Sequence, residues 1–117
     1  MNWVQLTATK ELEQLKELSK NNLILIFKHS TKCGTSRTVL SRFERAWREE
    51  EMKKVKPYFL DLLVHRDVSD KIEEGFGIIH ESPQLLLIKD GKCIFNVSHY
   101  GVDYMFLKNK LFKILKN

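Results

Sequence analysis

Cysteine is scarce in this chain, which excludes one common way of holding a small protein together. Only Cys33 and Cys93 occur among 117 residues, too few for a disulfide framework. These cysteines and the four histidines show none of the paired spacings of zinc ligands, so we expect no bound metal. Stability must come from a hydrophobic core, and a chain of this length can bury one within a single domain, residues 1–117.

Long apolar runs are also missing. No segment approaches the roughly 20 apolar residues that a membrane-spanning helix needs. The first residues, 1–6, lack the basic start and apolar stretch of a signal peptide. Together with the low cysteine count, these absences lead us to predict a cytoplasmic protein. In that reducing compartment an isolated cysteine is more often catalytic or inert than bridged.

Segments with charges of only one sign are absent from most of the chain, where acidic and basic residues are mixed, although the net charge is +5. Only the C-terminal stretch carries bases without acids, namely Lys108, Lys110, Lys113 and Lys116. We interpret these lysines as the solvated face of a helix, and a surface for nucleic acid or membrane is the alternative. Our prediction is that neither nucleic acid nor a membrane is a partner.

The periodicity of apolar residues predicts alternating helices and strands. Helical spacing follows Thr9, a candidate cap, and continues through Leu12, Leu15 and Leu18. Three more helices are expected. One covers about 34–50, and the next begins at residue 67 or 69 and is closed by Gly75 and Gly77. The last begins at about 103, and its inward residues are Leu107, Leu111, Ile114 and Leu115. Strands are expected at 23–28, at 58–63 after Pro57, at 85–89 and at 93–97.

This order of elements restricts the topology. A strand, helix and parallel strand form a right-handed crossover, and Asp90-Gly91 between the last two strands is a strong hairpin signal. We therefore predict an α/β fold with a four-stranded mixed sheet, order 2-1-3-4, and helices on both faces.

Cys33 lies at the predicted junction between the first strand and the following helix. Unpaired N–H groups and the positive end of the helix dipole favour a thiolate there, and Lys32 and Arg37 add positive charge nearby. Since the thiolate is the nucleophilic form, Cys33 is a candidate reactive thiol. The alternative is a buried structural cysteine, which is a common role for this residue type.

Two segments resemble those of the thioredoxin fold. Residues 76–92, with Ser82-Pro83 ahead of the hairpin, resemble the thioredoxin stretch that carries a cis-proline, and Cys33 with Ser36 forms Cys-x-x-Ser in place of Cys-x-x-Cys. A closer resemblance is to the monothiol bacilliredoxin family, the YtxJ-like proteins of the bacillithiol system. It depends on Lys28-His29-Ser30-Thr31, Cys33, Ser36, His80-Glu81-Ser82-Pro83-Gln84 and Ser98-His99. Gly34-Thr35 departs from the Pro-Ile that usually follows the family's cysteine.

The resemblance implies a thiol-disulfide oxidoreductase that removes bacillithiol from S-bacillithiolated proteins through a mixed disulfide on Cys33. Bacillithiol is then a co-substrate rather than a tightly bound cofactor. Because the chain has no Gly-rich nucleotide loop, we expect NADPH to act only through a partner, a separate NADPH-dependent disulfide reductase.

Several residues are candidates for binding the small thiol. Ser82 and Pro83 are expected to position a bound disulfide, although Pro83 could merely begin a strand. The Ser36 hydroxyl could donate to the thiolate or face solvent. The complete set of predicted contacts is Thr31, Lys32, Gly34, Thr35, Ser36, Ser82 and Pro83.

Cys93 is not expected to resolve the mixed disulfide. In the predicted sheet it lies two strands from the strand that precedes Cys33, on the order of 10 Å away, whereas a disulfide needs Cα atoms within about 7 Å. We interpret Cys93 as structural. Two other functions compete with the leading one: a non-catalytic thioredoxin-like protein-binding module, and an iron–sulfur carrier of the monothiol glutaredoxin type, whose Cys-Gly-Phe-Ser motif is absent because residue 35 is Thr.

Overall fold

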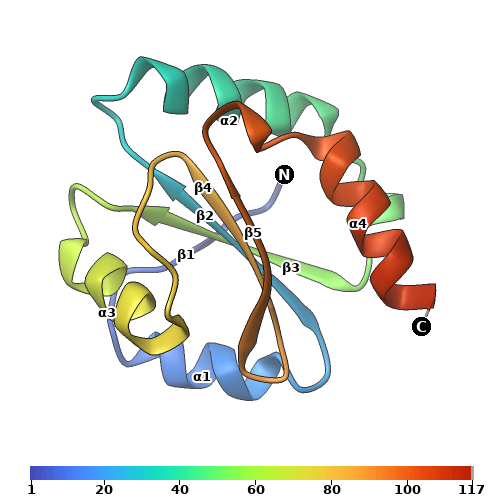
Figure 1. Cartoon of the computed structure of the whole chain (residues 1–117), viewed down its shortest axis with the longest axis horizontal. Helices are drawn as coiled ribbons and strands as arrows, with labels where there is room; N and C mark the ends of the chain where they lie inside the picture. The colour runs from blue at the N-terminus through green and yellow to red at the C-terminus, as the bar shows by residue number, and fades with distance from the viewer. Residues whose placement is uncertain (117) are drawn as a thin grey trace.

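A computed structural model describes residues 1–116 as a sheet with helices on both faces (Figure 1). Helices α2 and α4 cover one face of the sheet, and α1 and α3 cover the other. In chain order the elements are β1 (Val4–Gln5), α1 (Glu11–Leu18), β2 (Leu23–His29), α2 (Gly34–Ala46), the 3-10 helix η1 (Glu49–Glu51), β3 (Val55–Asp61), α3 (Arg66–Phe76), β4 (Gln84–Lys89), β5 (Lys92–Ser98), the 3-10 helix η2 (His99–Gly101) and α4 (Tyr104–Lys116).

The sheet has five strands in the order β1-β3-β2-β4-β5. The predicted order 2-1-3-4 is confirmed as β3-β2-β4-β5, with β2 and β3 parallel and the last two strands antiparallel. The predicted number of strands is wrong, since β1 pairs in parallel with Tyr58 and Phe59 at the outer edge of β3. A strand of two residues is too short to show an alternating pattern.

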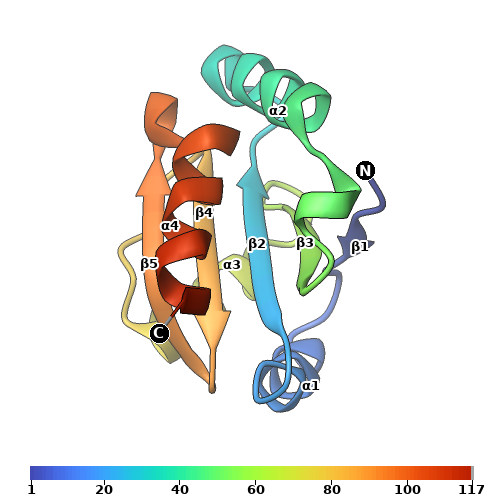
Figure 2. The same cartoon turned by 90° about the vertical axis from the view of Figure 1, so that its right-hand side faces the viewer.

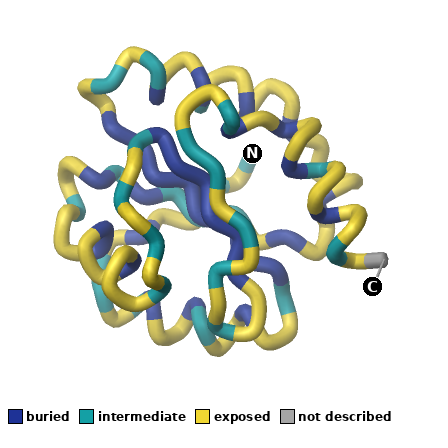
Figure 3. The backbone as a smooth tube through the Cα atoms, in the orientation of Figure 1, coloured by how far each residue is buried: buried dark blue, intermediate teal, exposed yellow. Residues whose placement is uncertain are grey.

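Strand β2 is buried along its whole length between β3 and β4, as the dark central tube of Figure 3 shows. Side chains alternate between the two faces of a strand. Leu25 and Phe27 pack under α2 and α4, while Ile24 and Ile26 pack with residues of α1 and α3. The next two residues of β2, Lys28 and His29, therefore point to opposite faces.

Strand β3 begins at Val55, three residues before its predicted start, so Pro57 lies inside it. A proline in a strand needs a position where its missing N–H is not required by a neighbouring strand. Pro57 meets that condition in two ways. Its backbone nitrogen faces away from β2, on the side of β3 where β1 lies, and Pro57 is just outside the segment that pairs with β1.

Three predicted helix ends are wrong. Thr9 does not cap α1, whose N-cap is Lys10; instead the Glu11 carboxylate accepts the N–H groups of Thr7 and Ala8, each at 2.8 Å. Helix α2 ends at Ala46, before the predicted residue 50, and is followed by η1. Helix α3 begins at Arg66, before the predicted start at residue 67 or 69, and ends at Phe76. Its C-cap is Gly77, with φ 68°, as predicted for a C-terminal glycine, whereas the other candidate glycine lies inside the helix.

One leucine of the apolar stripe expected along the first helix, and one leucine expected to face inward from the last helix, are partly exposed. Leu18 is 40% exposed and Leu115 is 50% exposed. A helix repeats every 3.6 residues, so successive steps of three residues rotate the side chain by about 60° each. Leu12 and Leu15 remain buried, and the third leucine of that series has rotated off the buried face.

Candidate active site

Cys33 lies where β2 ends and α2 begins, as predicted. Figure 2 shows the end of β2, the start of β4 and the end of β5 at the same edge of the sheet, beneath α2. Cys33 is the N-cap of α2, and its Sγ accepts the backbone N–H of Ser36 at 3.4 Å. The sulfur thus occupies the place of a capping oxygen at a helix N-terminus. The side chain is only partly buried.

The residues around Cys33 form a short loop with an exposed outer side. Thr31, Lys32 and Gly34 are exposed, and Thr35 is half-buried. The Arg37 guanidinium donates to the Thr31 carbonyl at 2.7 Å, which closes the loop from the side of α2. These four predicted contact residues therefore lie on the solvent-facing side of the loop that carries Cys33.

Ser36 differs from these residues because its side chain is completely buried. Its hydroxyl accepts the Ser30 N–H at 3.2 Å and lies 2.7 Å from His29 Nδ1. Of the two alternatives for this hydroxyl, donation to the thiolate or exposure to solvent, exposure is therefore wrong. The group of Ser36 that reaches the Cys33 sulfur is its backbone N–H.

His29 occupies the face of the sheet beneath α2. Only 6% of its surface is exposed, and its ring lies 5.5 Å from the ring of Phe59. Burial lowers the pKa of His29, and a smaller opposing effect comes from the negative charge of Asp61. The imidazole is therefore neutral at pH 7 and has one ring nitrogen available as an acceptor.

Ser82 and Pro83 lie at the start of β4, beside the end of β2. The pairing of Lys28 with Gln84 places these two residues next along the antiparallel register, opposite the segment that leads to Cys33. The Ser82–Pro83 peptide bond is cis. Among the residues described, the buried Ser82 hydroxyl has no hydrogen-bond partner.

A polar contact joins this loop to the end of β5. The Glu81 carboxylate accepts a hydrogen bond from the Ser98 hydroxyl and lies 3.7 Å from His99 Nε2. The His99 backbone N–H donates to the Pro83 carbonyl at 2.9 Å. His99, which the sequence leaves without a role, thus contacts the segment that carries Ser82 and Pro83.

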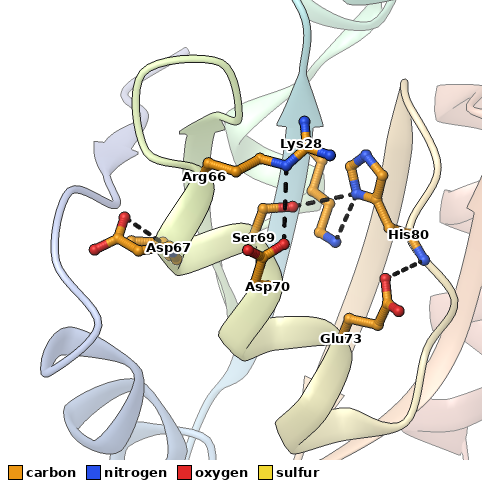
Figure 4. A network of polar contacts seen from close by, with 8 residues as sticks. Lys28, Arg66, Asp67, Ser69, Asp70, Glu73 and His80 are labelled. Carbon is orange, nitrogen blue, oxygen red and sulfur yellow. Dashed lines mark hydrogen bonds and ion pairs between the residues drawn. The ribbon is translucent and has the colours of Figure 1, made fainter.

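The second unusual residue of β2 is Lys28, which is completely buried on the face covered by α3. Its Nζ lies 3.4 Å from His80 Nδ1, and the Ser69 hydroxyl lies 3.2 Å from the same nitrogen (Figure 4). The His80 backbone N–H donates to the Glu73 carboxylate at 2.9 Å. The loop ahead of Ser82 is therefore held by both β2 and α3.

Burial dominates the ionisation of this cluster. Loss of hydration lowers the pKa of Lys28 to about 8, against the opposing influence of Glu73 and Asp70. Burial also lowers the pKa of His80, followed by the positive charges of Lys28 and Arg66. Two neighbouring cations would repel each other, so a neutral His80 is the natural acceptor for the Lys28 amine.

Sequence reasoning did not assign His80 or Lys28 to this cluster, and it left His29 without a defined contact. The sequence pattern that could have pointed to them is the alternation of β2, which sends the adjacent polar residues Lys28 and His29 to opposite faces of the sheet. Alternation alone does not identify their partners, because Ser36, Ser69 and His80 come from other elements.

Cys93 lies at the opposite end of the sheet from Cys33, near the Asp90–Gly91 turn. Ser98, at the other end of β5, is five positions further along the chain, about 17 Å along a strand. Its thiol donates to the Phe95 carbonyl at 3.3 Å, and burial raises its pKa. Both cysteines are free, which agrees with a structural role for Cys93.

Within residues 1–116, no group of three or more histidine, cysteine or acidic side chains could hold a metal ion. The same part of the chain contains no helix that is long and apolar enough to cross a membrane.

Comparison with known proteins adds the family to this geometry. The family model for monothiol bacilliredoxin BrxC matches residues 4–107, which include Cys33, Ser82 and Pro83. The chain belongs to the monothiol bacilliredoxin BrxC family. The resemblance inferred from the sequence is thereby confirmed.

Solved structures show the same fold. A thioredoxin-fold protein whose assignment as an oxidoreductase is provisional has 27% identity and a TM-score of 0.77, over 91% of this chain and 90% of that chain. Thioredoxin from Trypanosoma brucei brucei has 18% identity and a TM-score of 0.78, over 99% and 93%. Thioredoxin from Malassezia sympodialis has 17% identity and a TM-score of 0.75, over 96% and 90%. The predicted thioredoxin-like α/β fold is confirmed.

Proposed function

We propose that this protein removes bacillithiol from S-bacillithiolated proteins, with Cys33 as the nucleophile. The observation that carries the proposal is the Cys33 sulfur at the N-cap of α2, partly exposed and accepting the Ser36 N–H. An N–H that donates to sulfur stabilises the negative charge of a thiolate. Membership of the bacilliredoxin family indicates bacillithiol as the small thiol.

The reaction is an exchange of disulfide partners. The Cys33 thiolate attacks the bacillithiol sulfur of the mixed disulfide, a new S–S bond forms, and the substrate cysteine leaves as a thiolate that takes up a proton. A second bacillithiol, as its thiolate, then attacks the adduct on Cys33. This step yields bacillithiol disulfide and regenerates the Cys33 thiolate.

An external thiol is required because no second cysteine of this chain reaches the adduct. Residue 36, one helical turn after Cys33, is a serine, and Cys93 is at the far end of the sheet. A separate NADPH-dependent reductase would return bacillithiol disulfide to the thiol. Free cysteines of this kind fit a reducing compartment, so we place the reaction in the cytoplasm.

The surrounding residues have defined parts in this proposal. The exposed side chains of Thr31 and Lys32 and the half-buried side chain of Thr35 offer polar contacts to the small thiol, and Gly34 leaves the approach to the sulfur open. Ser82 and Pro83 present backbone opposite the segment that leads to Cys33, where the bound disulfide would lie.

The test uses a purified protein that carries one bacillithiol on a single cysteine, together with free bacillithiol. We expect intact mass spectrometry to show release of bacillithiol by the wild type and by Cys93→Ser, and none above background by Cys33→Ser. Release by Cys33→Ser at the wild-type rate would contradict the proposal. Failure of the wild type to release bacillithiol would favour a non-catalytic binding module instead.

A further inference from the structure

We propose that His29 is a positioning residue for Cys33 and acts through Ser36. This inference rests on the proposed function of Cys33 as a nucleophile. Ser36 carries two groups that face different partners: its hydroxyl contacts His29 at 2.7 Å, and its backbone N–H donates to the Cys33 sulfur at 3.4 Å. One residue thus links a buried imidazole to the reactive sulfur.

The direction of the hydrogen bond follows from the donors present. The Ser30 N–H can only donate, so it takes one lone pair of the Ser36 oxygen. The arrangement that also gives the hydroxyl proton a partner is the neutral His29 tautomer with its own proton on Nε2, in which Nδ1 accepts from the Ser36 hydroxyl. Both sides of the hydroxyl are then satisfied within the protein, which matters because a buried polar group without a partner costs about 1–3 kcal/mol.

The charges around His29 come from two elements. Asp61, at the end of β3, favours the charged imidazole, as does Glu44 on α2, and Arg37 on α2 opposes it. The ring also packs against Phe59 and Phe27. This enclosed setting keeps the imidazole in one orientation.

The consequence for the sulfur is geometric. Ser36 is the third residue of α2, and its N–H is one of the donors that a helix N-terminus leaves unpaired. Anchoring the Ser36 side chain to His29 and Ser30 fixes that N–H towards Cys33. Without the anchor, the first turn of the helix would be free to move and the sulfur would lose part of its charge stabilisation.

The test compares His29→Phe, His29→Asn and Ser36→Ala in the full chain. Phenylalanine keeps a ring for packing but removes the acceptor, while asparagine restores an acceptor near the position of Nδ1. The readout is thiolate absorbance of Cys33 against pH in a Cys93→Ser background, with thermal unfolding recorded for every variant. His65→Gln is the matched control, because it removes a half-buried histidine that precedes α3 instead of the one that contacts Ser36.

We expect the pH at which half of Cys33 is thiolate to rise by about one unit in His29→Phe and Ser36→Ala, and to return close to the wild-type value in His29→Asn. The smaller thiolate fraction is partly offset by greater intrinsic nucleophilicity, so reaction with 5,5′-dithiobis(2-nitrobenzoate) at pH 7 should slow by up to about threefold.

The double variant His29→Phe/Ser36→Ala decides whether His29 acts through Ser36. If it does, the double variant matches the single ones, since both remove the same link. Additive effects, or an unchanged Cys33 titration in folded His29→Phe, would overturn the inference. The aromatic disulfide probe separates this outcome from failure of the proposed function, which would appear as Cys33 reacting with the probe but not with bacillithiol disulfide.

Discussion

A buried lysine should make the stability of this protein depend on pH in a defined way. Lys28 is completely buried in β2, and burial lowers its pKa from 10.5 to about 8. An unfolded chain binds the Lys28 proton more tightly than the folded one does. Replacing Lys28 by methionine, which is similar in length and uncharged, removes this difference.

The magnitude follows from the gap between the two pKa values. A gap of about 2.5 pH units, at about 1.4 kcal/mol per unit, corresponds to about 3–4 kcal/mol. Below pH 8 both states hold the proton, and the folded state carries the full cost of the buried charge. Between pH 8 and 10.5 the folded state loses its proton first, so the stability of the wild type rises with pH relative to Lys28→Met.

The assay is urea unfolding of wild type and Lys28→Met at several pH values from 7 to 10. We expect Lys28→Met to be the more stable protein at pH 7, by up to about 3–4 kcal/mol, with the difference shrinking as the pH approaches 10. Other groups titrate in both proteins and cancel in the difference. Lys89→Met, at an exposed lysine of β4, is the control and should give a difference that stays flat with pH. A flat difference for Lys28→Met as well would refute this reasoning.

Three further predictions concern the site and the backbone. Ser36→Cys should form a disulfide with Cys33 under oxidising conditions, seen as a loss of two hydrogens in the intact mass; persistence of the bacillithiol adduct on Cys33 would contradict this. Gly77→Ala should lower the free energy of unfolding by about 1 kcal/mol, because φ is 68° there, and an unchanged urea midpoint would count against it. Gly101→Ala should cost about 1–3 kcal/mol, because its Cβ would lie 2.5 Å from Val97 Cγ2, and unchanged thermal unfolding would show that this side chain yields freely.

Much of the fold was predictable because its strands have strong apolar patterns. The central strand β2 is nearly continuous in apolar residues, and Asp90 and Gly91 both adopt the positive φ of the expected hairpin turn. Strand β1 was missed because two exposed residues carry no periodicity. Helix ends were misplaced where a side chain other than the expected one satisfies the backbone, as Glu11 does ahead of α1.

The candidate site was predictable only in part. The place of Cys33 followed from the junction of a buried strand with an amphipathic helix, which is local in sequence. The partners of Lys28 and His29 were not, because they depend on which element packs over each face of β2. Ser36 shows the limit most clearly: its proximity to Cys33 follows from helical spacing, whereas its burial against His29 requires the packed structure.

The central claim is that Cys33 is a thiol selective for bacillithiol. The most direct measurement incubates the reduced protein with bacillithiol disulfide and, separately, with glutathione disulfide, and then maps the adducts by mass spectrometry. We predict a bacillithiol adduct on Cys33, little glutathione adduct and an unmodified Cys93. No adduct, or equal slow modification of both cysteines by either disulfide, would contradict it.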